Sequence, residues 1–421
     1  MKKVFGKIYE PYFYILLIYL FFLCLAFILD SPQNLYNGLV AIINSRSVLI
    51  TDYVAVGGLR ATLLNVVLVG VINVILLIKS QVKPHGATIM ALFLTIGFSF
   101  FGKNIINMIP LTIGVKLYAM SQKKPFLNYS VVALLSATVS PVVSEIAALQ
   151  IGGRYVGILV GALVGIIIGF IFPVLASFCV RIHDGYNLYN LGFVGGLISS
   201  FVLAILNAIG YDVETASLWS TGNNLVLAIA LYGISGFLII AGFVSGKDRN
   251  TLKDLKEILR HPGRLATDFF TMVDSSAYVN MGIMGILGTS VVLIFGWDLN
   301  GPTISGIMTM IGFGAFGKHL RNTVPLIIGA LLGAFLNQWP MDTPSNVLAV
   351  LFSTGLAPIA GRFGPIWGII AGALHVTFVM HVRFLNNGLN LYNNGFAAGF
   401  VALLLVPIIT SLRDEREKRK Q

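Results

Sequence analysis

The sequence contains little charge and almost no cysteine. Charged side chains make up 11% of its 421 residues, against roughly 25% in soluble domains. The two cysteines, Cys24 and Cys179, lie in apolar runs, so they predict neither a disulfide framework nor a metal-binding spacing. The HExxH and CxxC motifs, acidic clusters and the GxxxxGK(S/T) phosphate loop are also missing. We therefore expect no catalytic residue, no metal ion and no cofactor, and we predict neither an enzyme nor a nucleotide-driven pump.

Apolar residues dominate what is present. They make up 56% of the chain, the mean hydropathy is +0.86, and runs long enough to cross a bilayer recur from end to end. The formal net charge of +11 comes from basic residues concentrated in short loops and the tail. That distribution is typical of cytoplasmic loops that contact anionic lipid, and it argues against a nucleic-acid partner. The fold class predicted is all-α, a polytopic transmembrane helical bundle.

The apolar runs predict about fourteen spans in a plasma membrane. Lys2, Lys3 and Lys7 before the first span, and the basic segments 247–268 and 413–421, place both termini in the cytoplasm by the positive-inside rule. The first run lacks a small-residue cleavage site, so we expect it to be retained. The predicted spans are 11–29, 60–79, 87–101, 105–121, 129–149, 156–178, 187–209, 221–245, 276–296, 303–316, 322–337, 345–360, 364–382 and 389–411.

Three blocks of sequence occur twice and in the same order. FGKNIINMIPLTIG at 101–114 returns as FGKHLRNTVPLIIG at 316–329, which separates Lys103 and Lys318 by 215 residues. The other two pairs have offsets of 217 and 203 residues, so the chain is a duplication with small insertions or deletions. These pairs are LLSATVSP at 134–141 with LFSTGLAP at 351–358, and GYNLYNLGFVGG at 185–196 with GLNLYNNGFAAG at 388–399.

The duplication predicts the domain organisation. The first membrane repeat occupies 1–246, with a core at 52–210, and its last span at 221–245 begins the second repeat. A basic cytoplasmic loop at 247–268 follows, then the second repeat core at 269–412 and the tail at 413–421. Seven predicted spans separate the two FGK copies, and an odd number turns them in opposite directions through the bilayer. The expectation is two inverted seven-span repeats with broken or re-entrant helices.

The FGK copies place lysines, amides and prolines inside apolar sequence. Interrupted helices in membranes leave free backbone groups that bind solutes or ions, and a lysine there would favour an anion. Alternatively, each lysine extends to the membrane interface or pairs with a buried acid. The substrate-binding residues predicted here are Lys103, Asn104, Asn107, Lys318 and Asn322, and the helix-breaking prolines are Pro110 and Pro325.

The NLYNxGF copies place amides and a phenol at the head of a span. Such groups could line a filter with donors and acceptors, while glycines allow close backbone approach. The alternative is an asparagine-capped helix start with an interfacial tyrosine. The predicted substrate-binding residues are Asn187, Tyr189, Asn190, Asn390, Tyr392 and Asn393, and Gly192 and Gly395 are predicted to break helices.

Glu145 is an isolated acid within an apolar run, and the second copy carries Arg362 near the equivalent place. Intramembrane ionisable groups often couple proton or cation movement to transport. The alternative is a structural ion pair between Glu145 and Lys103 or Arg154, which we favour slightly.

The blocks IGFSFFGKNIINMIPL, GLAPIAGRFGPIWG and GLNLYNNGFAAGF resemble an uncharacterised family of integral membrane proteins from Gram-positive bacteria, known as a domain of unknown function. The resemblance covers nearly the whole chain and implies no activity. NLYNNGFAAG is also similar to the Tyr-Asn-Gly segments of urea transporters, which are duplicated, inverted channels. This sequence differs from them in the spacing of Asn and Gly, in seven rather than five spans per half, and in its lysines.

The functional prediction is a secondary transporter or channel-like carrier for a small polar or anionic solute. Its binding site is expected at the interface of the two inverted repeats. A passive urea-type channel for a small neutral solute is one alternative, and a membrane-embedded scaffold or enzyme is another. The expected partners are the solute and membrane lipid, and a homo-oligomer of the chain is left open.

Overall fold

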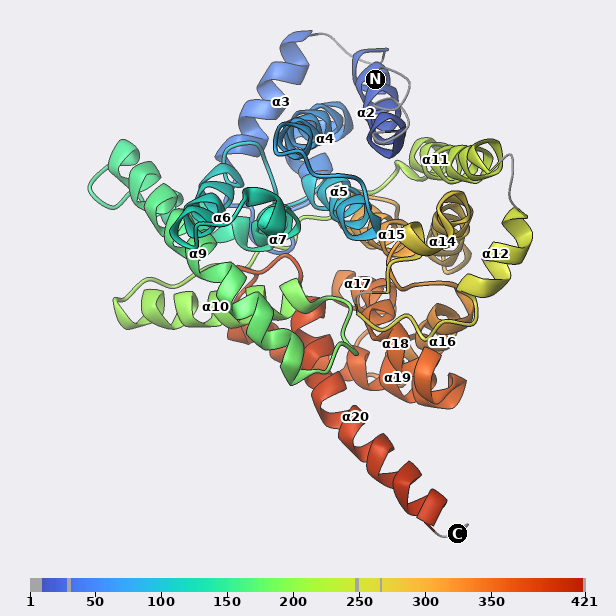
Figure 1. Ribbon diagram of the computed structural model, residues 1–421. Coiled ribbons are helices and arrows are strands. Elements are labelled where there is room, and N and C mark those ends of the chain that lie inside the picture. The colour runs from blue at the N-terminus through green and yellow to red at the C-terminus, as the bar shows by residue number, and fades with distance from the viewer. Residues whose placement is uncertain (1–9, 29–31, 247–249, 266, 419–421) are drawn as a thin grey trace.

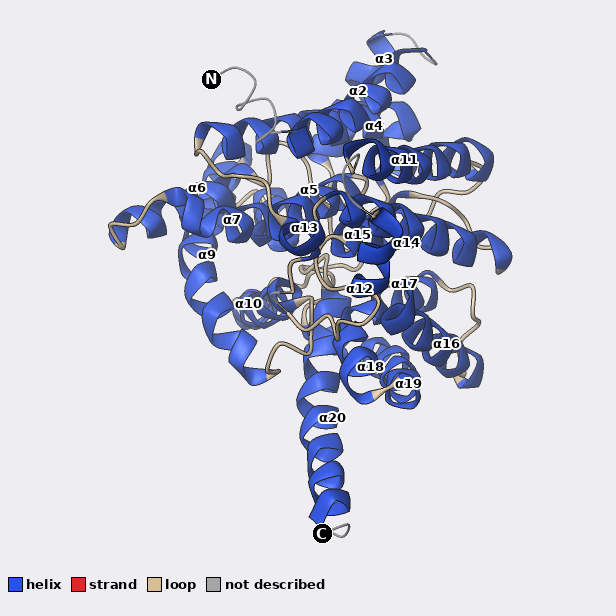
Figure 2. Ribbon diagram, turned by 45° about the vertical axis from the view of Figure 1, so that its right-hand side comes forward, coloured by secondary structure: helices blue, strands red, loops and turns tan. Residues whose placement is uncertain are grey.

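The computed structural model describes residues 10–28, 32–246, 250–265 and 267–418, and throughout these residues the regular structure is helical (Figure 2). The prediction of an all-α fold is therefore confirmed. Several predicted cytoplasmic residues lie outside the described part of the chain, namely Lys2, Lys3, Lys7, Lys247, Arg419 and Lys420.

The helices follow a similar order in the two halves of the chain (Figure 1). In the first half they are α2 (Glu10–Ile28), α3 (Pro32–Asn44), α4 (Tyr53–Lys79), α5 (Gly86–Ser99), α6 (Ile109–Ser121), η1 (Phe126–Tyr129), α7 (Ser130–Ser136), η2 (Ala137–Val139), α8 (Ser140–Ala148), α9 (Arg154–Ile182) and α10 (Asn190–Ala208). In the second half they are α11 (Asn224–Ser245), α12 (Thr251–Ile258), α13 (Phe269–Val273), α14 (Ser275–Ile294), α15 (Gly301–Gly314), α16 (Leu320–Leu336), α17 (Pro344–Phe352), η3 (Ser353–Leu356), α18 (Ala357–Phe363), α19 (Pro365–Val382), η4 (Arg383–Leu385) and α20 (Asn393–Lys418).

Ten helices within the described residues are long and apolar enough to cross a membrane. The four predicted spans around the FGK copies are shorter, because α5, α6, α15 and α16 have 14, 13, 14 and 17 residues. At 1.5 Å per residue, a helix of this length falls short of the roughly 30 Å hydrocarbon core. The membrane-protein class is thus supported by ten candidate spans rather than by fourteen full-length ones.

The chain is interrupted between α5 and α6, and between α15 and α16, at glycine. Gly102 and Gly317 have φ of 77° and 105°, a region that glycine enters without steric cost. The prolines do not make these interruptions. Pro110 lies in the first turn of α6, where the missing N–H is not needed, and Pro325 lies inside α16.

Helices α5 and α15 form the buried centre of the molecule (Figure 1). All residues of α15 and all but Ala87 of α5 are buried. A Cβ at Gly97 would lie 2.8 Å from the Cα of Ser305, and one at Gly312 would lie 2.9 Å from the Cβ of Phe93. These glycines let the two helices approach closely, so protein rather than lipid surrounds both.

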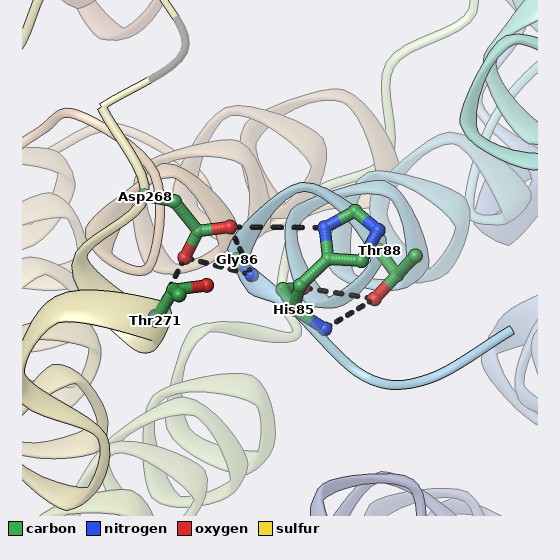
Figure 3. Close-up of polar contacts among 5 residues, drawn as sticks. All are labelled: His85, Gly86, Thr88, Asp268 and Thr271. Carbon is green, nitrogen blue, oxygen red and sulfur yellow. Dashed lines mark hydrogen bonds and ion pairs between the residues drawn. The ribbon is translucent and has the colours of Figure 1, made fainter. Parts of the chain in front are cut away.

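Two aspartates tie the halves together in a reciprocal way. Asp52 precedes α4, and one of its carboxylate oxygens accepts a hydrogen bond from the amide of Gly301, which begins α15, at 3.2 Å. Asp268 precedes α13 and accepts hydrogen bonds from the amide of Gly86, which begins α5, at 2.9 and 3.0 Å (Figure 3). Each half therefore supplies a carboxylate to the positive end of the other half's central helix.

Replacing Asp268 with asparagine keeps a hydrogen-bond acceptor but removes the charge, and it should lower stability at neutral pH by about 1 kcal/mol, the upper end of the usual contribution of a negative charge near a helix N-terminus. Burial raises the pKa of Asp268, but the contact with His85 and the amides of Thr271 and Gly86 lower it more, so its pKa lies below the ordinary value. The stabilisation is then present above the unfolded pKa and is lost as pH falls through the folded one. Thermal unfolding in detergent should show a gap between wild type and variant at neutral pH that shrinks as pH falls below about 4.

The exposed Asp212→Asn is the control, and it should leave the midpoint unchanged over the same range. A gap for Asp268→Asn that persisted in strong acid, where the carboxylate is protonated, would contradict the assignment of a charged cap.

Candidate functional site

The first FGK break is organised by asparagines. The side chain of Asn107 accepts a hydrogen bond from the amide of Asn104 at 2.9 Å and donates one to the carbonyl of Gly102 at 3.0 Å. Asn104 accepts a hydrogen bond from the amide of Asn107 at 3.0 Å and donates one to the hydroxyl of Tyr53 at 3.3 Å. These predicted binding residues are largely occupied in fixing the backbone of the break.

The second break has the same construction. Asn322 accepts a hydrogen bond from the amide of His319 at 2.9 Å and donates one to the carbonyl of Gly317, also at 2.9 Å. Interrupted helices need such partners because their free backbone groups have no water to bind inside a membrane.

Sequence reasoning missed one asparagine at each break. The side chain of Asn65 on α4 donates hydrogen bonds to the carbonyls of Ser99 and Lys103, at 2.8 and 3.0 Å. Asn280 on α14 donates to the carbonyls of Gly314 and Lys318, both at 2.7 Å. Asn65 and Asn280 are separated by the same 215 residues as the two lysines, and that offset was the signal that could have found them.

Lys318 is completely buried at the centre of the molecule. Its ammonium group donates a hydrogen bond to the hydroxyl of Thr354 at 2.8 Å. It donates another to the hydroxyl of Tyr189, which belongs to the other half of the chain. It also lies 4.5 Å from the ring centroid of Tyr189 and 5.0 Å from that of Phe313. All of these partners are neutral.

Lys103 is equally enclosed, with 3% of its surface exposed, but its environment differs. Its ammonium group donates to the hydroxyl of Thr95 and the carbonyl of Leu134, both at 3.2 Å. Tyr392 occupies the position of Tyr189 in the second copy of the motif, so the repeat would make it the partner of Lys103. The ammonium group of Lys103 instead bonds to Thr95 and Leu134. In the described part of the chain neither lysine forms an ion pair with a carboxylate.

The two NLYNxGF segments cross each other where α10 and α20 begin. The side chain of Asn187 donates a hydrogen bond to the carbonyl of Gly395, and Asn390 donates one to the carbonyl of Gly192, each at 3.0 Å. Both asparagines are fully buried. The structure thus brings together predicted residues from the two halves, and these amides bind backbone of the opposite half.

The tyrosines of the two segments meet at the crossing. The rings of Tyr189 and Tyr392 have centroids 4.5 Å apart, within the range of favourable aromatic pairs. Gly192 and Gly395 do not break a helix, because they lie in the first turns of α10 and α20. A Cβ at Gly192 would lie 2.9 Å from the backbone carbonyl oxygen of Tyr392, and one at Gly395 would lie 2.9 Å from that of Tyr189. The glycines therefore permit the crossing.

The last asparagine of each motif forms its hydrogen bonds within its own half of the chain. Asn190 is hydrogen bonded to His183 at 2.9 Å and donates to the carbonyl of Ala176 at 3.0 Å. Asn393 accepts a hydrogen bond from Asn386 at 2.8 Å. The Asn190–His183 and Asn386–Asn393 bonds each join residues seven positions apart. They therefore fix the turns that precede α10 and α20.

Glu145 has a partner that the sequence did not indicate. Its carboxylate lies 2.8 Å from the guanidinium of Arg46, and Glu145 itself is fully buried. The expected partners Lys103 and Arg154 are not paired with it. Arg362, at the corresponding place in the second half, is exposed. Glu145 is therefore paired, but with Arg46 and with neither of the two partners expected from the sequence.

A cavity borders each break. The first-break cavity has a volume of about 480 Å³ and is lined in part by Asn104, Asn107, Ser144 and Arg154. The second, which we term the basic cavity, has a volume of about 390 Å³. Neither is lined by Lys103 or Lys318. The basic cavity is lined by Leu259, Arg260, His261, His319, Arg321, Ala360, Gly361, Arg362, Phe363, Gly364, Pro365 and Arg413.

Within the described ranges, no three His, Cys, Asp or Glu side chains gather at one point that could hold a metal ion. In comparison with known proteins, the family described as "Protein of unknown function (DUF1576)" matches residues 31–208 and 247–411. No curated protein and no solved structure matches the chain.

Proposed function

We propose that this chain, which belongs to the DUF1576 family of proteins of unknown function, is a membrane carrier for a small anionic solute. The observation that carries the proposal is the pair of buried lysines, Lys103 and Lys318, whose hydrogen-bond partners are all neutral. Burying an ammonium group without a counter-charge is costly. An anionic solute that reaches the centre would supply that counter-charge.

The lysines at the two breaks have different bonding partners, and this asymmetry supports a carrier. Lys318 contacts Tyr189 across the two halves, whereas Lys103 bonds within its own half. In secondary transporters, repeats related by symmetry adopt different arrangements, and exchanging these arrangements opens the site to alternate sides. In the proposed exchange, Lys318 loses its contact with Tyr189, and Lys103 forms the equivalent contact with Tyr392.

The candidate spans support an inverted orientation of the repeats. Five of the ten precede residue 209 and five follow residue 223. If the α5–α6 and α15–α16 pairs each enter and leave on one side, five crossings per half turn the second half upside down relative to the first. An even total leaves both ends of the chain on the same face, which the basic loops assign to the cytoplasm. The first-break cavity and the basic cavity then open to opposite sides of the membrane.

Proteoliposomes containing the purified full-length chain test the proposal. We expect saturable uptake of at least one class among inorganic anions, small carboxylates and phosphate esters, with empty liposomes as the control. Non-saturating urea flux would favour the passive channel instead. The absence of flux for every class tested, from protein shown to be folded, would favour the scaffold.

A further inference from the structure

The basic cavity is formed by four segments that are fixed against one another, namely the loop after α12, the second break, α18 and α20. His319 at the second break is hydrogen bonded to the carbonyl of His261 at 2.8 Å. A Cβ at Gly361 would lie 2.2 Å from the carbonyl oxygen of Pro262, so the loop after α12 packs directly on α18. Arg413 of α20 donates to the carbonyl of Phe363 at 2.8 Å. The walls of the cavity are therefore built into the fold.

Four arginines line this cavity, and no described lining residue carries a carboxylate. In the part of the chain that the structure describes, Arg260, Arg321 and Arg362 form no ion pair with an acid. Guanidinium groups bind phosphate oxygens through paired hydrogen bonds. The charge and the donors at the cavity thus suit a phosphate group.

The first half of the chain provides an internal comparison. With the repeat offsets of 215 to 217 residues, Arg260, Arg321 and Arg362 correspond to Asn44, Ile106 and Glu145. Asn44 and Ile106 line the first-break cavity, so that the same architecture is built there without the three arginines. The fold does not require arginine at these positions, and their convergence on one cavity points to a ligand.

An apolar groove continues from the basic cavity. It has a volume of about 350 Å³ and shares Phe363, Gly364, Pro365 and Arg413 with the cavity. Its other walls, from α19 and α20, are Ile366, Trp367, Ile409 and Leu412. Ile366 is 71% exposed and Leu412 45% exposed, and α20 projects beyond the bundle in this region (Figures 1 and 2). A free phosphate would use only the cavity, whereas a lipid would use both parts.

We propose that the basic cavity and the groove together bind one anionic phospholipid, with the phosphate among Arg260, Arg321 and Arg362 and an acyl chain along α19 and α20. Arg413 stands at the boundary, because its guanidinium lies 5.0 Å from the ring centroid of Phe363, which both parts share. Basic pockets between helices on the cytoplasmic side are suited to such headgroups. This site does not depend on the proposed transport activity.

Fluorescence of Trp367 reports on the groove. The full-length protein is reconstituted in phosphatidylcholine bilayers that contain a minor fraction of a lipid with brominated acyl chains, which quench tryptophan on contact. The brominated lipid is phosphatidylglycerol in one preparation and phosphatidylcholine in the other. The component lost in Trp367→Phe isolates this residue from the other three tryptophans. We expect stronger quenching of that component by brominated phosphatidylglycerol.

The variant Arg260→Gln/Arg321→Gln/Arg362→Gln should reduce the preference for phosphatidylglycerol more than about tenfold, since each basic residue near anionic lipid contributes about fivefold. All three positions are exposed, and the single Arg321→Gln should lose part of the preference. Lys256→Gln, an exposed change on α12 outside the cavity, should keep it.

Equal quenching by the two lipids, or a preference that survives the triple variant, would overturn the proposal. Arginine-dependent binding of inorganic phosphate to the detergent-solubilised protein, without preferential quenching by phosphatidylglycerol, would also overturn it and assign the cavity to a soluble anion.

Discussion

Replacing Lys318 with methionine is expected to reduce solute uptake strongly and to stabilise the fold at the same time. A hydrogen bond to a charged group contributes about 1.5–3 kcal/mol, so losing the ammonium should reduce uptake roughly tenfold to a hundredfold. Replacing a buried ion pair with apolar side chains of similar volume is often neutral or stabilising by about 1–4 kcal/mol. A lone buried ammonium has no attraction to a counter-ion to lose, so its replacement should change stability in the same direction. The hydroxyls of Tyr189 and Thr354 already lie 3.0 Å apart, and they would remain hydrogen bonded to each other.

Uptake in proteoliposomes and the thermal midpoint in detergent measure the two effects on the same preparation. Lys103→Met should behave similarly but gain less stability, because the carbonyl of Leu134 would lose its donor. Lys79→Met, an exposed change at the end of α4, should alter neither quantity. A variant Lys318→Met with a lower midpoint and normal uptake would show that the lysine is structural, as the alternative interpretation of the motif holds.

The helical membrane fold could be predicted because composition and apolar run length report directly on burial in lipid. The number of full-length spans could not. Helices α5 and α15 are as apolar as true spans, but protein surrounds them instead of lipid. Hydropathy does not distinguish burial in protein from burial in lipid. Glycine does not mark the helix ends either, because glycines also occur inside spans.

Sequence comparison of the two halves located the breaks but did not show which role each residue has there. The lysines and the asparagines share one motif, yet the asparagine side chains chiefly bind the backbone of their own break, while the ammonium groups bind hydroxyls and one carbonyl outside it. The partner of Glu145 could not be found either. Arg46 lies 99 positions away in a loop, and a single sequence contains no signal for a pair at that separation.

Replacing Asn187 or Asn390 with alanine should destabilise the protein strongly, because each side chain ties the two halves together at the crossing. Removing either amide leaves a buried carbonyl of the opposite half, at Gly395 or Gly192, without its donor. Each change should cost about 2–3 kcal/mol. Asn390→Ala should cost more, because Asn390 also accepts a hydrogen bond from Thr138 at 2.8 Å.

The double variant tests whether the two ties form one unit. A Cβ at Gly395 would lie 3.0 Å from the Cα of Gly192, so loosening one tie should weaken the other and make the double variant cost less than the sum of the singles. Chemical unfolding in mixed micelles would measure all three, with the exposed Asn207→Ala as a control expected within about 0.5 kcal/mol of wild type. Unchanged stability with altered solute selectivity would instead mean that these amides face the solute, as a urea-type channel requires. Additive losses would mean that the halves are held independently at each tie, and the proposed exchange of the Lys318 and Lys103 contacts through this crossing would then have no shared element to act on.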